Sequence, residues 1–346
     1  MLALYLTWAA VPGLAARLWR RHRHVARWLF LLGLAGVCTL QDPATNKDRG
    51  AYSIFIQAVA EEGLPLLEPA FLVLIKVLQV RLADATLELA FFFVVALASL
   101  AIKFKLLERY GGSLFGSLAT FFSYFFLTQE MTQVRVGLGI GLLYLSWFAY
   151  AESRWRAFWV WGVLAAMCHY SCVLFMVAPL LFSVRERLKW RIALAILTFV
   201  CVAMAFAGNL MPELLSGLAG ATELEKLQTY SDWLDEGVLT EITPARLVPH
   251  VILLLIVALH WKKWRRDRIS YLLAQIYMFG LVVFALLSPI PVLAYRVSDL
   301  FLFASVFVLG RLRPFMALSI YIPFVVLYTG GLLVYTLQVQ KLFGGG

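Results

Sequence analysis

An arginine, Arg135, stands at the start of a long apolar segment in the stretch QVRVGLGIGLLYLSWFAYA. That segment, residues 136–151, leads into a basic loop, so we expect its start to lie on the outer side of a membrane. A helix N-terminus offers free N–H groups, and an arginine offers a planar fork of donors; both suit phosphate oxygens. Gly137, Gly139 and Gly141 allow another helix or a ligand to approach the backbone. The pattern indicates an anion site, but an arginine that merely extends to the outer interface gives the same pattern.

A second arginine, Arg296, has the same expected position, at the outer end of the apolar segment 296–310. Asp299 follows three residues later, on the same helix face, and this pairing could equally be structural. Few basic residues lie away from the basic loops, and two of them stand at helix entrances beside apolar segments. Arg49 and Arg246 are further candidates on the same side of the membrane.

His169 lies at the tip of a predicted hairpin whose arms are residues 157–169 and 172–184. Each arm has about 13 residues, roughly 20 Å of helix, which places the tip below the outer surface. A lone histidine in an apolar setting is often a hydrogen-bonded core residue. An ionisable group inside a membrane is nevertheless a functional candidate, and an imidazole can remove a proton from a hydroxyl near neutral pH.

The composition explains what must position these side chains. Hydrophobic residues make up 62% of the 346-residue chain, charged residues only 14%, and long apolar runs recur throughout. A bilayer core about 30 Å thick needs roughly 20 mostly apolar residues per helix. The runs are too long and too uniformly apolar for barrel strands, so the sequence predicts an all-α polytopic integral membrane protein.

The net charge of +10 is a topology signal rather than evidence for a nucleic-acid partner. Short clusters between the apolar segments hold 21 of the 30 Lys and Arg residues, and these clusters are predicted to be cytoplasmic. The clusters are residues 17–27, 103–109, 152–156, 185–191, 262–268 and 311–313. About twelve crossings, within a range of about 11–13, then put both termini outside. The crossings are near 1–16, 28–41, 85–102, 113–127, 136–151, 157–169, 172–184, 190–207, 246–261, 269–288, 296–310 and 314–336.

Residues 1–343 are predicted to form a single transmembrane domain. Its main external, periplasmic loops are expected at about 42–67 and 208–246, with shorter outer stretches at 128–135 and 289–296. Residues 68–85 are interrupted by charged side chains and are predicted to form an amphipathic helix at the outer interface. The terminal glycines, 344–346, are interpreted as a cloning remnant.

Taken in order, several short motifs resemble the EpsG-like branch of the bacterial Wzy-type polysaccharide polymerases. The resemblance covers about residues 42–310. Its motifs are DRGAY with Asp48 and Tyr52, EPAF with Glu68, QVRVGLG with Gln133, Arg135 and Gly137, CHYS with His169 and Ser171, and YR with Tyr295 and Arg296. Where members of the family often have an aromatic residue directly after the Asp, this chain has Arg49.

The resemblance implies a GT-C-like polymerase or ligase architecture in the inner membrane, with a periplasmic active site. Its substrates would be undecaprenyl-diphosphate-linked oligosaccharide repeat units, as both donor and acceptor. Arg135 and Arg296 suit the donor diphosphate, and His169 is the first candidate for the base, with Asp48 and Asp232 behind it. Tyr230 and Trp233 could bind sugar. The other residues expected at the substrate are Arg49, Tyr52, Glu68, Gln133, Tyr295 and Asp299.

No paired-carboxylate motif calls for a metal, and no cofactor is expected. The expected partners are the lipid-linked oligosaccharides, membrane lipid, a chain-length regulator and a flippase, with no nucleic acid. Two alternatives stay open. A transporter or flippase for an anionic lipid would use the same arginines, although the chain shows no matching halves. An O-antigen ligase would use the same donor and differ only in its acceptor.

Overall fold

We analysed a computed structural model of the chain, which describes residues 25–41, 49–60, 68–82, 84–182, 196, 198, 247–288 and 291–339. Within these ranges every regular element is a helix, which confirms the all-α fold. The chain divides into two compact units, residues 1–181 with 306–346, and residues 182–305, and each is described by itself. The prediction of one membrane domain over residues 1–343 stays a prediction.

The first unit begins with four helices, and the last of them is the longest helix in the described part of the chain. They are α2 (Val25–Thr39), α3 (Arg49–Ala60), α4 (Pro69–Gln79) and α5 (Asp84–Tyr110). The middle of the unit contains α6 (Leu114–Thr120), the π-helix η1 (Phe121–Glu130), α7 (Val134–Ala151), α8 (Trp155–Cys168), the 3₁₀-helix η2 (Tyr170–Met176) and α9 (Val177–Leu181). Its last part contains most of α17 (Ala304–Arg311), η4 (Arg313–Phe315), α18 (Leu318–Val334) and the π-helix η5 (Tyr335–Val339).

The second unit contains α13 (Leu247–Leu259), α14 (Trp261–Trp264), α15 (Arg268–Leu286) and α16 (Pro291–Leu302). The α15 and α16 helices pack along each other, and α13 packs on α15. Asp267 caps α15, because its carboxylate accepts hydrogen bonds from the backbone N–H and the hydroxyl of Ser270, at 2.9 and 2.8 Å.

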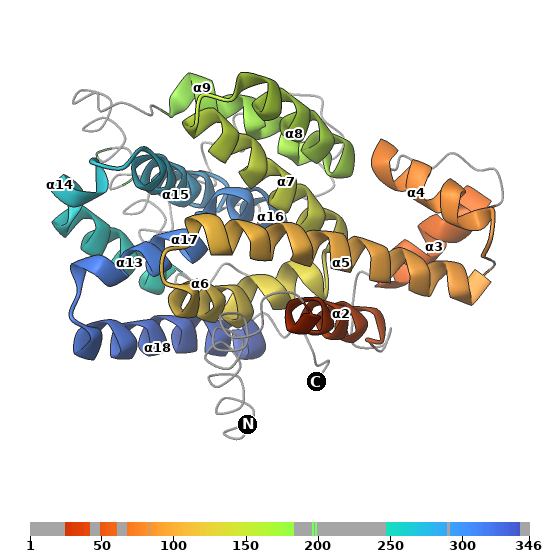
Figure 1. Cartoon of the computed structure of the whole chain (residues 1–346), viewed down its shortest axis with the longest axis horizontal. Coiled ribbons are helices and arrows are strands. Elements are labelled where there is room, and N and C mark those ends of the chain that lie inside the picture. Colours follow the sequence, from red (N-terminus) through yellow and green to blue (C-terminus); the bar gives the residue numbers. More distant parts are fainter. Residues whose placement is uncertain are drawn as a thin grey trace. The chain divides into compact units, whose positions relative to one another are not determined.

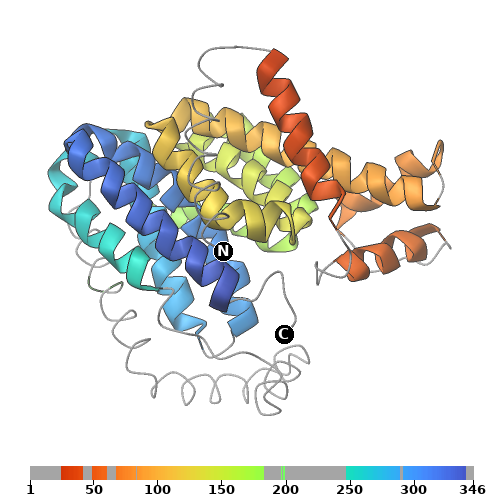
Figure 2. The ribbon, with the colours of Figure 1, turned by 90° about the horizontal axis from the view of Figure 1, so that it is seen from below.

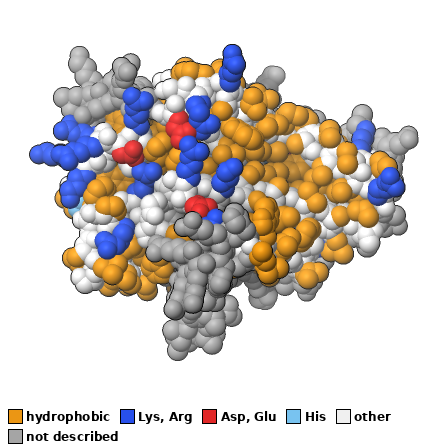
Figure 3. Space-filling view, viewed as in Figure 1, with side chains coloured by type: hydrophobic (Ala, Val, Ile, Leu, Met, Phe, Trp, Pro, Cys, Tyr) orange, Lys and Arg blue, Asp and Glu red, His pale blue; other side chains and the backbone are white. Residues whose placement is uncertain are grey.

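Five helical stretches in the described part of the chain are long and apolar enough to cross a membrane, in agreement with a polytopic protein. They are Thr86–Tyr110, Val134–Ala151, Arg268–Leu286, Leu293–Arg311 and Leu318–Leu337. Several shorter apolar helices accompany them, among them α8 and the segment Tyr170–Leu181. Figure 3 shows a broad area of hydrophobic side chains on the visible face of the first unit.

The α7 helix lies between α5 and the hairpin that α8 forms with η2 (Figure 1). Glycines make this close packing possible on both sides. A methyl group at Gly141 would lie 3.1 Å from the side chain of Ile102 on α5. One at Gly139 would lie 3.0 Å from Cys172 Sγ and 3.1 Å from His169 Cβ on the hairpin. The prediction that these glycines admit neighbouring helices is confirmed.

Beside α5 lie the three preceding helices (Figure 2): α2 packs on it, and α3 and α4 pack on it and on each other. Phe71 of α4 is buried edge-on against Phe91 of α5, with ring centroids 5.8 Å apart. Residues 68–85 were predicted to form one amphipathic helix. The structure has the shorter α4 there, and α5 begins at Asp84.

Two expectations about loops are wrong. The basic cluster 103–109 was expected to be a loop, but it lies inside α5, and the fully buried side chain of Lys103 pairs with Glu130. The stretch 128–135 was expected to be an outer loop. Its first part, Thr128 to Glu130, is instead the buried end of η1, since these polar side chains find partners inside the protein.

Candidate functional site

Glu68 stands at the entrance of α4 and directs its side chain away from its own helix. Pro69 occupies the first helical position, and the Glu68 carbonyl accepts from the N–H groups of Phe71 and Leu72 at 3.0 and 3.3 Å. Its carboxylate caps none of the free N–H groups of α4, although glutamate could do so there. The side chain is only 6% exposed, so a buried carboxylate needs partners from other elements.

Arg135 supplies the first of these partners from the first turn of α7. Its Nη1 donates to Glu68 Oε2 at 2.7 Å, and its side chain remains 23% exposed. Tyr52 and Phe55, three residues apart and so on one face of α3, lie against the same guanidinium. Their ring centroids are 5.0 and 5.4 Å from its central carbon, within the range of cation–π attraction.

His169 supplies the second partner from the tip of the α8–η2 hairpin, as predicted. It ends α8 and begins η2 in an extended conformation, with its N–H donating to Ala165 O at 2.9 Å and its carbonyl accepting from Cys172 N at 2.8 Å. Its Nδ1 lies 3.2 Å from Glu68 Oε1. The hairpin tip reaches this position because it packs on Gly139, one helical turn after Arg135 and on the same face of α7.

The three side chains therefore form one cluster, which we call the Glu68 cluster: Glu68, Arg135 and His169. Each carboxylate oxygen of Glu68 holds one of the two other groups. A carboxylate beside Nδ1 favours the tautomer with a proton on Nδ1, so Nε2 carries the lone pair. Among the described residues, Glu68 is the one hydrogen-bond partner of the imidazole, and the side chain is 18% exposed. The cluster joins an anion-binding group to a potential base.

Burial alone would raise the pKa of the Glu68 carboxyl. The hydrogen bond with His169 and the positive charge of Arg135 act in the opposite direction and outweigh it, so the pKa lies below its usual value. Glu68 is therefore ionised at neutral pH. Because its pKa is lower folded than unfolded, ionised Glu68 stabilises the fold above the unfolded pKa, and this stabilisation is lost as the pH falls through the folded value.

The lowered pKa of Glu68 leads to a first prediction. The measurement is the thermal unfolding midpoint of wild type and of Glu68→Gln in detergent, as a function of pH. Wild type should be more stable by a constant margin above about pH 5, and the margin should shrink only below about pH 4.3. The matched control is Glu108→Gln, whose carboxylate pairs with Arg27 but is 46% exposed, and which should show little margin at any pH. A margin that closes already between about pH 5 and 7 would mean that burial dominates and the pKa is raised.

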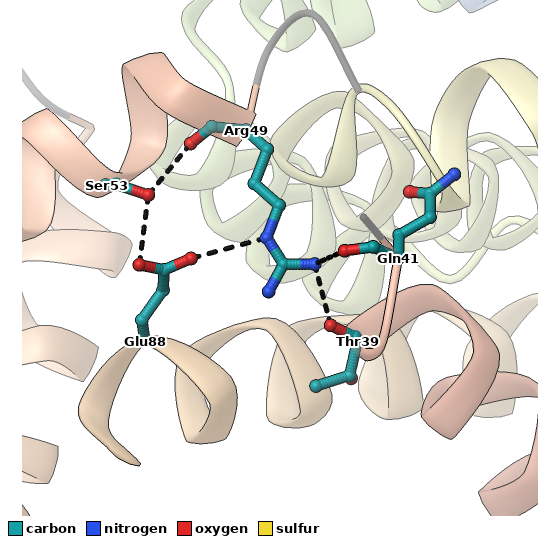
Figure 4. A network of polar contacts seen from close by, with 5 residues as sticks. All are labelled: Thr39, Gln41, Arg49, Ser53 and Glu88. Carbon is teal, nitrogen blue, oxygen red and sulfur yellow. Dashed lines mark hydrogen bonds and ion pairs between the residues drawn. The ribbon is translucent and has the colours of Figure 1, made fainter. Parts of the chain in front are cut away.

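Arg49 lies one helical turn before Tyr52 on α3 and is only 5% exposed. Its Nη1 donates to the carbonyls of Thr39 and Gln41, at 2.7 and 2.6 Å, where α2 ends (Figure 4). Its Nε lies 3.3 Å from Glu88 of α5, which also accepts from Ser53. Arginine suits these carbonyls because the end of a helix leaves them unpaired and slightly negative.

The Arg49 side chain also lies over the ring of Phe92, 4.7 Å from its centroid, and Phe92 meets Tyr52 edge-on at 5.7 Å. The arginine therefore ties α2, α3 and α5 together and fixes the aromatic face that covers Arg135. A role for Arg49 in substrate binding stays a prediction.

The remaining candidates are not assigned to the Glu68 cluster. Gln133 precedes α7, and its N–H donates to Thr128 O at 3.0 Å. Tyr295, Arg296 and Asp299 belong to α16 in the second unit, and a shared site with Arg135 stays a prediction. Asp48, Tyr230 and Asp232 lie outside the described residues, as do Arg246 and Trp233.

One expectation about Arg296 is wrong. The apolar segment was predicted to begin at Arg296, but α16 already begins at Pro291, whose fixed φ suits the first position of a helix. Arg296 therefore lies in the second turn, exposed, whereas Asp299 is buried.

Sequence reasoning missed Phe55, which lies on Arg135, and the buried pair of Lys103 and Glu130. Phe55 follows Tyr52 at helical spacing, and that spacing is the signal that could have found it. For Lys103 the signal was its place at the end of an apolar run, directly after Ile102 and directly before Phe104.

Comparison with known proteins identifies the family to which the chain belongs. No curated protein and no solved structure matches the chain. The model of one family, described as the EpsG family, matches residues 28–343, which include the whole of the Glu68 cluster and nearly all of the chain. This multi-pass helical membrane protein therefore belongs to the EpsG family.

Proposed function

We propose that the protein is a membrane glycosyltransferase that polymerises undecaprenyl-diphosphate-linked oligosaccharide repeat units on the outer face of the plasma membrane. Membership of the EpsG family indicates a membrane protein of the polysaccharide-polymerase type. The substrate, the side of the membrane and the assignment of individual residues are our proposal.

The observation that carries the proposal is the double contact of Glu68 with Arg135 at 2.7 Å and His169 at 3.2 Å. Glycosyl transfer from a lipid diphosphate needs a cation where the diphosphate leaves and a base where the acceptor hydroxyl attacks. The Glu68 cluster offers both groups from different helices, and both side chains are partly exposed. A purely structural ion pair would need only one of them.

In the proposed reaction, Nε2 of His169 takes the proton of the acceptor hydroxyl. The hydroxyl oxygen then forms a bond to the anomeric carbon of the donor sugar, while the bond from that carbon to the diphosphate oxygen breaks. The diphosphate keeps the electron pair, and the guanidinium of Arg135 stabilises the charge that develops on it. Glu68 keeps the imidazole in the required tautomer and stabilises it once it is protonated, as a carboxylate does beside the histidine base of other enzymes.

The other predicted residues extend this proposal. Arg296 would share the diphosphate with Arg135, Tyr230 and Trp233 would contact sugar, and Asp232 would lie at the substrate. The reaction as written uses no metal and no cofactor, because arginine supplies the charge that a metal would supply elsewhere. A chain-length regulator and a flippase are proposed partners.

The test is the length of the lipid-linked glycans in cells that lack the gene and in cells that carry it again. A polymerase is supported if loss of the gene reduces a ladder of lipid-linked chains to single repeats. Polymer that accumulates on the lipid carrier would instead indicate a ligase, and single repeats confined to the inner leaflet would indicate a flippase. Either of these two results would overturn the proposal.

A further inference from the structure

Lys103 and Glu130 form an ion pair whose two side chains are both fully buried. Lys103 lies in α5, within a stretch that is apolar and long enough to span a membrane, and Glu130 is the last residue of η1. Lys103 Nζ also donates to Gln129 Oε1 at 2.9 Å, and the Ser99 hydroxyl donates to Glu130 Oε1 at 3.0 Å. We call Ser99, Lys103, Gln129 and Glu130 the Lys103 network.

The Lys103 network is a poor source of stability, so its presence needs another explanation. Removing two charges from water costs about as much as their attraction returns, and apolar residues of similar size often serve stability as well or better. Two of its buried atoms, Gln129 Nε2 and Glu130 Oε2, have no hydrogen-bond partner within the described residues, which adds to the cost. Ionisable groups inside a membrane usually mark a functional element.

The π-helix η1 brings together Gln129 and Glu130, the two residues whose side chains pair with Lys103. Its hydrogen bonds reach five residues back, as from Met131 N to Phe126 O at 3.1 Å and from Gln133 N to Thr128 O at 3.0 Å. A π-helix rotates by less per residue than an α-helix, so neighbouring side chains such as Gln129 and Glu130 can both face Lys103. Such wide turns often occur at functional sites.

The network is joined directly to the start of α7. Only residues 131–133 separate Glu130 from Val134, and the hydroxyl of Thr132 donates back to Leu127 O of η1 at 3.0 Å. A methyl group at Gly137 would lie 2.8 Å from Gln129 O and 3.4 Å from Glu130 Oε1. One at Gly141, a turn later on the same face, would lie 3.7 Å from Cγ of Lys103.

The α7 helix therefore has two functional faces. Gly137 and Gly141 pack on the Lys103 network, whereas Arg135 and Gly139 face Glu68 and the His169 hairpin. Whatever fixes the end of η1 also fixes where Arg135 lies relative to His169. We propose that Lys103 and Glu130 are positioning residues of the glycosyl transfer, an inference that rests on the proposed function: their ion pair holds the entrance of α7 so that Arg135 and His169 act on one substrate.

The test uses the double variant Lys103→Met/Glu130→Met in the full-length protein. Each single change should strongly reduce folded protein, because it leaves one buried charge unpaired, whereas the double variant should recover it. If the pair positions Arg135, kcat per folded molecule in the double variant should fall by about tenfold to a hundredfold with little change in KM, since small displacements of this kind are costly in the transition state. The control is Arg27→Met/Glu108→Met, a more exposed ion pair that joins α2 to the same helix α5 and should keep its kcat.

A second variant leaves both charges in place. Gly137→Ala introduces a methyl group that must push α7 away from backbone atoms of η1, so kcat should fall here too. Gly33→Ala, where no atom lies within 4 Å of the added methyl, is the matched control. Full turnover in the folded double variant, or in Gly137→Ala if the double variant does not fold, would overturn the positioning role. Failure of the proposed function is distinguishable, because wild type itself would then form no polymer.

Discussion

Replacement of Arg135 by alanine should reduce polymer formation by about a hundredfold to a thousandfold, the usual effect of removing one donor that stabilises charge in a transition state. In the proposed reaction the diphosphate leaves with an extra negative charge, and Arg135 is the arginine of the Glu68 cluster, with a side chain 23% exposed. The measurement is the rate of chain elongation per folded protein, in membranes with matched expression. Arg81→Ala is the control, since Arg81 is an exposed arginine in the turn that ends α4 and should be dispensable.

A lysine at position 135 separates charge from geometry. Lysine can keep an ion pair with Glu68, but it has no planar fork to match the guanidinium that lies against Tyr52 and Phe55. Arg135→Lys should therefore restore only part of the rate.

Alanine also leaves the buried Glu68 with one partner fewer, so its effect on folding must be measured separately. The double variant Arg135→Ala/Glu68→Gln removes that unpaired charge and should recover stability without recovering activity. Full activity in Arg135→Ala would remove this arginine from the mechanism.

The sequence alone predicted the elements whose signals are local. The end of α7 at Ala151, and its start to within two residues of the predicted 136, followed from a long apolar run between polar ends. His169 at a hairpin tip followed from two short runs between basic loops. These signals depend on the cost of polar groups in lipid, which acts on each segment separately. The Glu68 motif was recognised by its resemblance to the family.

The parts that failed depend on contacts between distant segments. Lys103 was counted as a loop charge because its partner Glu130 lies 27 positions away, and no periodicity links the two. The contacts of Glu68 with Arg135 and His169 span 67 and 101 positions, so their pairing could not be derived from spacing. Arg296 was misplaced because the helix start at Pro291 is separated from the polar residues by the apolar run Val292 to Ala294.

His169→Gln should lower the elongation rate by about a hundredfold to ten-thousandfold while the protein still folds. Glutamine can donate a hydrogen bond to Glu68 Oε1 and so can keep the contact that holds the hairpin tip beside α4. It cannot take a proton from a hydroxyl near neutral pH. The glutamine variant therefore removes the base and keeps the structural contact, whereas alanine would remove both.

The comparison that decides the role of His169 is between rate and stability. If His169 is the base, His169→Gln should unfold at nearly the wild-type temperature and elongate very slowly, and His169→Ala should be slow and also less stable. His260→Gln is the control, because His260 lies at the end of α13 with its Nδ1 on the carbonyl of Ile256, 3.0 Å away, and should keep wild-type activity. A Gln variant that elongates at the wild-type rate would make His169 a structural residue. Asp48 and Asp232 would then be the next candidates for the base, tested by replacement with asparagine.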